Sequence, residues 1–246
     1  DEGLLRYAVI LKDNYANLKS ILNKLRIKNI DGFLLDLGLS SIQLEKSNRG
    51  FSYLRREKLD MRFDDSSSFS AFNVINEYSS NKLAYIFSKY GQERWANKVA
   101  EGILNARKLK KIEFTDELVE IIKNSIPLKH YTGGHPAKRI FQAIRIEVNN
   151  ELENLKKALF EAVDLLNPYK RIAVITFHSL EDRIVKDCFN NFSGKCTCPS
   201  DLPICSCGAK KRGFQVLKKP VRPSAEEITE NPRSKSAKLR VFEKTM

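Results

Sequence analysis

Two segments of the sequence place polar side chains directly after a run of apolar residues. Asp36 and Ser40 follow the apolar run of DGFLLDLGLS, and His178 and Asp182 follow the β-branched run of AVITF. A carboxylate or an imidazole can accept a proton from a bound substrate, and a hydroxyl can hold one in a hydrogen bond. These four residues are therefore the catalytic candidates, and the chemistry that they indicate is general acid–base catalysis.

Each segment also has a purely structural interpretation. An aspartate at a strand end is commonly a cap or turn residue, and Glu181 and Asp182 can simply charge the N-terminus of a helix that follows His178. A Ser–His hydrolase is a weaker alternative for His178 and Ser179, because neighbouring side chains diverge and no G-x-S-x-G segment is present. The pairing of two polar strand ends is what favours a site.

Four of the five cysteines lie close together near the C-terminal end. They form the pattern C-x-C-x6-C-x-C with Cys196, Cys198, Cys205 and Cys207. Four thiolates can satisfy tetrahedral zinc, although C-x-C pairs are less typical of zinc sites than C-x2-C pairs. A reduced surface loop without metal is the alternative. The spacing therefore leaves a structural zinc site open.

The chain is strongly basic, with 43 Lys and Arg against 30 Asp and Glu and a formal net charge of +13. This excess predicts attraction to a polyanion, most simply a nucleic acid, and a solubilising basic surface is the alternative. The candidates for phosphate contact lie on a predicted helix after YTGGHP and in the C-terminal region: Arg139, Gln142, Arg145, Lys218, Lys219, Arg233 and Lys235.

Two predicted strands must position the polar residues. Residues 15–30 have apolar residues at helical spacing, and DGFLLDLG (31–38) is typical of a fully buried strand, so that the two form half of a parallel-sheet unit. RIAVITF (171–177) is a second strand. Because ligands of open α/β sheets bind outside the carboxyl ends of strands, we expect Asp36 and His178 to border one crevice.

Residues 47–135 have few strand signals and several helical patterns, including DELVEIIKNSI. We therefore predict an α/β core in two pieces, 1–46 and 136–246, interrupted by a helical insert, 47–135. No apolar run is long enough to cross a membrane, and no basic segment leads into an apolar stretch at the start. A cytoplasmic protein with no membrane partner is expected.

Several motifs together resemble one known family. DGFLLDLGLSSIQL, RGFSY, LDMR, YGQER, FQAIRIEVNNEL, ITFHSLEDRIVK and NPRSKSAKLR are similar, in the same order, to signatures of the ribosomal RNA small-subunit methyltransferase H family. The resemblance implies a Rossmann-like class I S-adenosylmethionine-dependent methyltransferase core with a helical insert, and on that basis we interpret residues 47–135 as an RNA-binding subdomain. It also implies methylation of N4 of a cytosine in bacterial 16S rRNA, at the decoding centre, with 16S rRNA or the small ribosomal subunit as partner.

The resemblance also implies roles for single residues. Asp36 and Gln43 match positions that contact the cofactor S-adenosylmethionine, and Tyr15 matches an aromatic position beside the adenine. The segment HSLEDR, which starts at His178, lies where the family builds its catalytic cleft. The sequence departs from the family pattern at Ile42, Thr176 and Lys235, and PYKR stands where the family has Pro-Gly-Gly.

One family feature is absent from the sequence. Members begin with a strand and a glycine-rich Gly-Gly-His-Ser loop, whereas here no two glycines are separated by a single residue. We therefore expect the N-terminal βα units to be missing. The alternative function is a catalytically impaired RNA-binding or ribosome-assembly module on a methyltransferase scaffold. A DNA cytosine-N4 methyltransferase is disfavoured because no S/D-P-P-Y segment is present, and a homodimer is left open.

Overall fold

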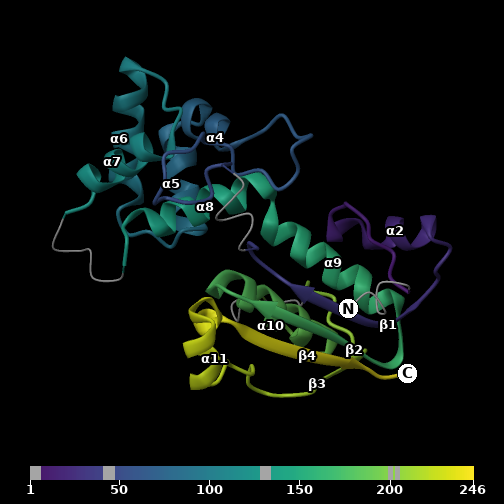
Figure 1. The fold of residues 1–246 in the computed structure, drawn as a ribbon. Helices are drawn as coiled ribbons and strands as arrows, with labels where there is room; N and C mark the ends of the chain where they lie inside the picture. The colour runs from purple at the N-terminus through teal and green to yellow at the C-terminus, as the bar shows by residue number, and fades with distance from the viewer. Residues whose placement is uncertain (1–6, 41–47, 128–133, 199–201, 203–205) are drawn as a thin grey trace. The chain divides into compact units, whose positions relative to one another are not determined.

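A computed structural model describes residues 7–40, 48–127, 134–198, 202 and 206–246. The chain divides into two compact units (Figure 1). The α/β unit comprises Asp1–Gly38 and Leu152–Met246, and the helical unit comprises Leu39–Glu151. No helix among the described residues has the length and apolar character that crossing a bilayer requires.

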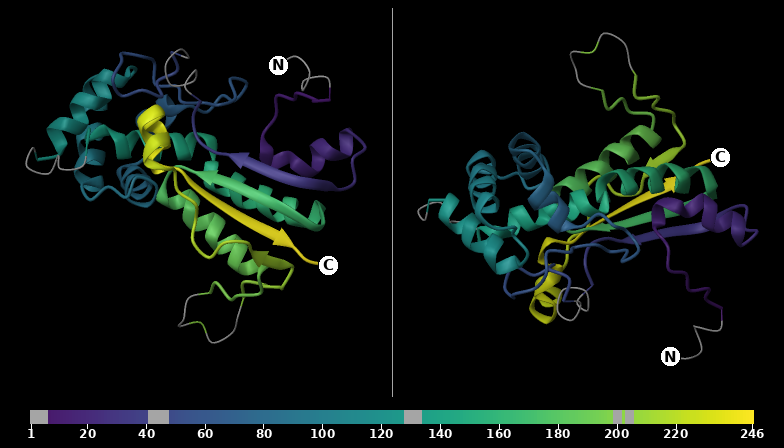
Figure 2. Two further views of the ribbon diagram at one scale, coloured as in Figure 1. Left: turned by 60° about the horizontal axis from the view of Figure 1, so that its bottom comes forward. Right: turned by 90° about the horizontal axis from the view of Figure 1, so that it is seen from above.

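The α/β unit contains one sheet in the order β1-β2-β4-β3 among the residues described. β1 is parallel to β2, and β4 is antiparallel to both β2 and β3. Both views of Figure 2 show β2 between β1 and β4. In chain order the elements of this unit are η1 (Tyr15–Asn17), α2 (Leu18–Lys24), β1 (Ile30–Asp36), α9 (Glu151–Leu165), β2 (Leu166–Thr176), α10 (Ser179–Phe192), β3 (Gly213–Gln215), α11 (Ala225–Glu230), η3 (Pro232–Ser236) and β4 (Lys238–Lys244).

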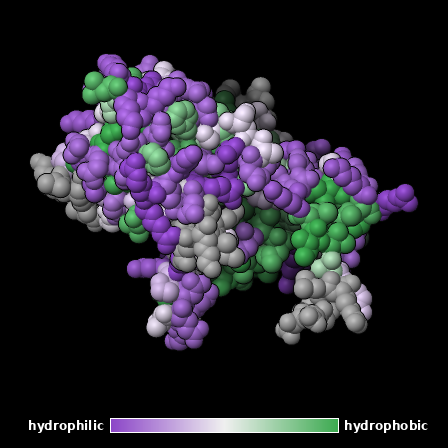
Figure 3. Space-filling model, turned by 45° about the horizontal axis from the view of Figure 1, so that its top comes forward, coloured by the Kyte–Doolittle hydropathy of each residue, from purple (hydrophilic) through white to green (hydrophobic). Residues whose placement is uncertain are grey.

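The predicted α/β class is confirmed, but β1 is not the fully buried strand that its composition indicated. Leu35 is buried with residues of α9 and α10, whereas Leu34, on the opposite face, is 65% exposed. Within the described residues β1 pairs only with β2, so it forms an edge of the sheet. Figure 3 shows a group of hydrophobic residues on the surface of the α/β unit. A run of apolar letters cannot reveal that one face of its strand is uncovered.

Aromatic rings hold α9, α10 and β4 together on the covered face of the sheet. The ring of Phe192 meets Phe160 edge to face at 4.9 Å between centroids and Phe242 at 5.7 Å. Phe189 lies 5.5 Å from Phe242. Edge-to-face pairs of buried rings add to the stabilisation from apolar burial, so this cluster fixes α10 against the sheet.

The helical unit contains five described helices around its own apolar core. Ile140 and Ile144, on one face of the last of them, are fully buried in this core, and for this reason residues 137–149 belong to the helical unit. The sequence pattern predicts that the α/β core resumes at residue 136, whereas the α/β unit resumes at Leu152. The helices are α4 (Ala71–Glu77), α5 (Ser80–Lys89), α6 (Ala96–Leu109), α7 (Thr115–Ser125) and α8 (Ala137–Asn149).

Side-chain hydrogen bonds add to backbone ones, such as Met61 N–H to the Arg49 carbonyl, in the polar segment before α4. The Asn149 amide donates to the Met61 carbonyl at 2.7 Å, and its oxygen accepts the Phe63 N–H at 2.7 Å. Arg62 donates to both carboxylate oxygens of Asp60, at 2.7 and 2.8 Å. The residues of the LDMR motif thus shape this loop, which is a structural reason for their presence.

Candidate active site

Asp36 ends β1 beside the end of β2. It is the register partner of Ile175, and the following Leu37 N–H donates to the Ile175 carbonyl at 3.1 Å. Gly38 then has a φ of +96°, and a Cβ added to it would lie 3.4 Å from the ring of Phe177. The exposed Asp36 and the residues that follow β2 therefore lie at the carboxyl ends of two neighbouring parallel strands, where ligands of such sheets bind.

His178 is the N-cap of α10. Its Nδ1 accepts the Glu181 N–H at 3.4 Å, and the Glu181 carboxylate accepts the N–H groups of Phe177 and His178 at 2.8 and 3.2 Å. Its Nε2 lies 3.1 Å from Glu181 Oε1, but the angle does not allow a hydrogen bond between them. In this structure His178 and Glu181 form a reciprocal capping box at the start of α10. The contacts of His178 are therefore those of a structural helix cap.

Asp182 joins α10 to β4. Its carboxylate accepts from Arg240 Nε at 2.7 Å and from Lys238 Nζ at 3.0 Å. Burial opposes ionisation of this carboxyl group, but the hydrogen bonds from the two cations outweigh it and lower the pKa of Asp182. A carboxylate held in this way is a weak base, so the geometry does not support Asp182 as a proton acceptor.

Glu181 is interpreted from the sequence only as a charge at the helix N-terminus, and Lys238 and Arg240 have no predicted role at this site. Glu181, Lys238 and Arg240 form the hydrogen bonds that hold the start of α10. A signal existed for Glu181, since an acid three residues after an N-cap completes a capping box. No local signal marked Arg240, because the sequence does not show that β4 pairs with β2.

The other predicted site residues do not all lie at the ends of β1 and β2. Tyr15 lies in η1 and packs, partly buried, against the core of the α/β unit. Ser40 is exposed and belongs to the helical unit. Gln43 lies outside the described residues.

Two of the candidates for phosphate contact on α8 form hydrogen bonds within the helical unit instead. Arg145 donates to both oxygens of Glu151, at 2.8 and 3.0 Å, and both side chains are largely buried. Gln142 Nε2 donates to the Tyr90 carbonyl at 3.0 Å. Arg139 has 59% of its side chain exposed, although its Nη1 also lies 3.9 Å from the buried Glu93 carboxylate and donates to the Gln92 carbonyl at 3.5 Å. Of the three, only Arg139 therefore stays a candidate for phosphate contact.

Replacement of Arg145 by methionine is expected to lower the free energy of unfolding by about 3–5 kcal/mol, because Glu151 would remain buried without its partner. Urea unfolding measures the change. The control, Lys138→Met at an exposed position on the same helix, should change stability by less than about 0.5 kcal/mol. Unchanged stability of the Arg145 variant together with weaker RNA binding would contradict this assignment.

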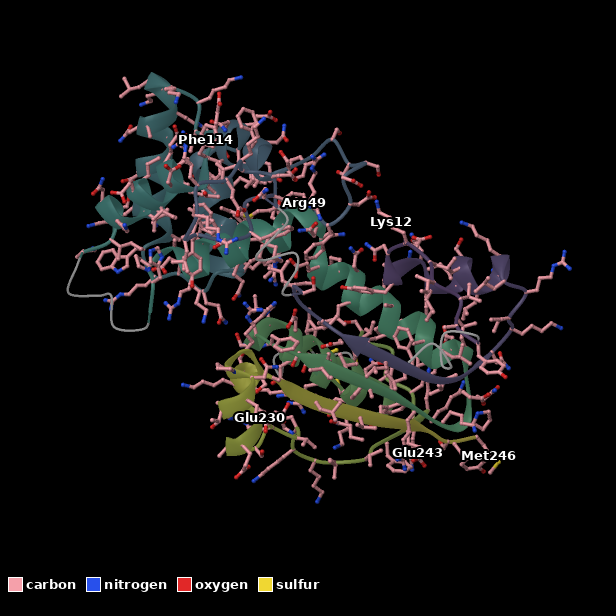
Figure 4. The ribbon with its side chains drawn as sticks, in the orientation of Figure 1. Lys12, Arg49, Phe114, Glu230, Glu243 and Met246 are labelled. Carbon is pink, nitrogen blue, oxygen red and sulfur yellow. The ribbon has the colours of Figure 1, made fainter. Side chains whose placement is uncertain are left out.

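The remaining basic candidates are exposed in the α/β unit. Lys218 and Lys219 lie between β3 and α11, and Arg233 and Lys235 lie in η3, just before β4. Figure 4 labels Glu243 near the other end of β4, where its carboxylate accepts from Arg171 at 2.8 Å. Because β4 is antiparallel to β2, β4 begins beside the end of β2. The segment η3, which precedes β4, is therefore connected to the end of the sheet where β1 and β2 terminate.

The cysteine pattern is partly described. The thiol sulfurs of Cys196, Cys198 and Cys207 all lie within 4.8 Å of one another. Cys205 lies outside the described residues. The spacing therefore brings at least three thiols to one place.

Comparison with known proteins gives one consistent result. The model of the MraW methylase family matches residues 4–245. Ribosomal RNA small subunit methyltransferase H 2 of Agathobacter rectalis is 50% identical over 237 residues, which are 96% of this chain and 76% of that protein. Ribosomal RNA small subunit methyltransferase H of Lachnospira eligens is 50% identical over 236 residues, 96% of this chain and 75% of that protein. The protein of the same name from Finegoldia magna is 48% identical over 238 residues, with coverage of 96% and 76%.

These matches extend along nearly the whole chain, across both the α/β unit and the helical unit. They confirm the resemblance that the ordered motifs indicated, including the α/β methyltransferase fold. The chain belongs to the MraW methylase family.

Proposed function

We propose that this protein transfers the methyl group of S-adenosylmethionine to N4 of a cytosine in bacterial 16S rRNA, at the decoding centre of the small subunit. The observation that carries this proposal is 48–50% identity along 96% of the chain to proteins named ribosomal RNA small subunit methyltransferase H. The polar residues at the carboxyl ends of β1 and β2 agree with a ligand site at that edge of the sheet.

The residues present at this edge fit S-adenosylmethionine. Asp36 offers an exposed carboxylate that can accept hydrogen bonds from the hydroxyl or ammonium groups of such a molecule. Tyr15 stays a predicted neighbour of the adenine, with part of its ring exposed. The bound cofactor supplies a methyl group already activated on a sulfonium. The task of the chain's own residues is therefore to hold and orient the cytosine.

Asp36 is also the best-placed group to activate the cytosine. The N4 amino group is a weak nucleophile because its lone pair is delocalised into the ring, and an acceptor that holds one N4–H favours the nucleophilic form. Asp36 is exposed, whereas Asp182 is held by two cations and Nδ1 of His178 accepts within the helix cap. We assign the acceptor role to Asp36, and Ser40 and His178 remain predicted contributors.

Methylation assays on three substrates test the proposal. Small-subunit particles, naked 16S rRNA and duplex DNA are incubated with the protein and methyl-labelled S-adenosylmethionine, and the labelled nucleoside is identified. The expected product is N4-methylcytidine in RNA. RNA binding without any binding of S-adenosylmethionine in calorimetry would instead support the catalytically impaired assembly module. Label in DNA alone would support a DNA methyltransferase.

Lys218 and Lys219 are proposed to contact RNA phosphates, together with Arg139, Arg233 and Lys235. Changing both lysines to glutamine should weaken RNA binding and reduce the slope of log affinity against log salt by about one for each phosphate that is no longer neutralised. Titration at several salt concentrations measures this slope. The control is Lys156→Gln with Lys157→Gln, a pair of exposed neighbouring lysines on α9. Equal slopes for the two double variants would remove Lys218 and Lys219 from the interface.

Three expectations complete the proposal. A zinc ion bound by the cysteines, which their spacing permits, would have no part in the proposed methyl transfer. A homodimer stays a prediction, which light scattering of the purified protein checks. The cytoplasm, where ribosomal subunits are assembled, stays the predicted location.

A further inference from the structure

The segment that joins α10 to β3 contains the cysteine cluster, and its two ends are held together. Ser193 and Lys211 form an isolated antiparallel bridge, and the Arg212 N–H donates to the Phe192 carbonyl at 2.7 Å. The side-chain amide of Asn191 donates to the Cys207 carbonyl at 2.8 Å. One ligand candidate is therefore fastened to the end of α10, a helix whose Phe189 and Phe192 are fully buried.

One sulfur–sulfur distance in the cluster matches the edge of a metal–thiolate tetrahedron. Sγ of Cys196 and Sγ of Cys207 are 3.8 Å apart. A zinc–sulfur bond of about 2.3 Å gives a tetrahedron whose sulfur–sulfur edge is about 3.8 Å. The same separation is far longer than the bond of about 2.05 Å in a disulfide. All three described sulfurs lie within 4.8 Å of one another, so one ion can contact each of them.

The third sulfur is held in place by a backbone hydrogen bond. The backbone N–H of Ser206 donates to Sγ of Cys198 at 3.3 Å. Backbone hydrogen bonds to a ligand atom also fix its direction, as outer-shell contacts do in known metal sites.

We propose that Cys196, Cys198 and Cys207 bind one zinc ion. Thiolates in a tetrahedral arrangement select soft or borderline ions, and zinc is the one that forms structural sites without redox chemistry. The ion cross-links the two arms of the segment between α10 and β3, where hydrophobic burial is slight because these cysteines are exposed or only partly buried. Its role is structural, and it is independent of the proposed methyl transfer.

Metal analysis of the intact protein tests this site. The protein is purified anaerobically without chelators, and zinc, iron and copper are measured together with the visible spectrum after exchange with Co²⁺. About one zinc per chain and the absorption bands of tetrahedral Co²⁺–thiolate are expected. Cys198→Ser should lose most of the metal and these bands. The matched control is Cys188→Ala, because that thiol is buried in α10 away from the cluster.

A second measurement does not depend on the yield of the variants. Removal of zinc by a chelator should speed proteolytic cleavage between residues 195 and 211 in the wild-type protein, and added zinc should reverse the change. Absence of zinc combined with absence of the Co²⁺ bands would overturn the proposal. Full metal content in Cys198→Ser, iron or copper in place of zinc, or a disulfide in the freshly purified protein would also overturn it.

Discussion

Replacement of Asp36 by alanine is expected to slow methyl transfer by about 100-fold or more, with little change in stability. Asp36 is exposed at the end of β1, so removal of its side chain creates no cavity and should change the free energy of unfolding by less than about 0.5 kcal/mol. The loss of rate follows from the loss of the acceptor that we assign to the cytosine N4–H. Single-turnover rates at saturating S-adenosylmethionine measure it.

Asparagine at position 36 separates the two roles predicted for this residue. Asp36→Asn keeps an oxygen that accepts hydrogen bonds, but a neutral amide oxygen holds the cytosine N4–H more weakly than a carboxylate does. Cofactor binding should therefore be retained while turnover falls. The matched control is Asp31→Asn, because Asp31 is an exposed aspartate near the other end of the same strand. Wild-type rates for both Asp36 variants would exclude Asp36 from the reaction.

Replacement of Asp182 by asparagine is expected to lower the free energy of unfolding by about 3 kcal/mol or more at neutral pH. Arg240 has only 9% of its side chain exposed and would lose its counter-charge at the junction of α10 and β4. Lys238→Met should cost less, because 27% of the Lys238 side chain is exposed and the pair between Asp182 and Arg240 remains. Urea unfolding of the variants gives the order.

The effect of Asp182 should depend on pH in a defined direction. Its pKa is lowered in the folded protein, so ionised Asp182 contributes stability above the pKa of the unfolded chain, about 3.9. This contribution is lost as the pH falls through the folded pKa. The difference in stability between wild type and Asp182→Asn should therefore be constant from about pH 5 to pH 8 and shrink below about pH 4.

A control and an activity measurement complete this test. Asp187→Asn, on the same helix, should leave stability within about 0.5 kcal/mol of wild type. If Asp182 were the catalytic base, its asparagine variant would be as stable as wild type and inactive. A stable, inactive Asp182→Asn protein is thus the outcome that contradicts the role described here.

Helix α8 shows which features of the fold the sequence could predict and which it could not. Helical spacing predicts the apolar face of α8, which includes Ile140 and Ile144. It does not predict that α8 belongs to the helical unit, because the residues against which α8 packs lie far away in sequence. For the same reason Arg145 was taken for a phosphate ligand. A basic residue that is buried against Glu151 and one that faces solvent have the same local sequence signal.

The order of the motifs, read from the sequence alone, determined the family, the α/β class and the two strand ends where Asp36 and His178 lie. Those features depend on short-range patterns of apolar and polar residues, which a linear chain displays directly. Only the tertiary structure decided which polar side chains are internal partners. Asp182 and Arg240 are 58 residues apart and meet because β4 pairs with β2, and the three cysteines converge because the chain turns back on itself after α10. The physical reason is that the energy of a charge or a thiolate depends on its neighbours in space, and strand pairing and turns choose those neighbours.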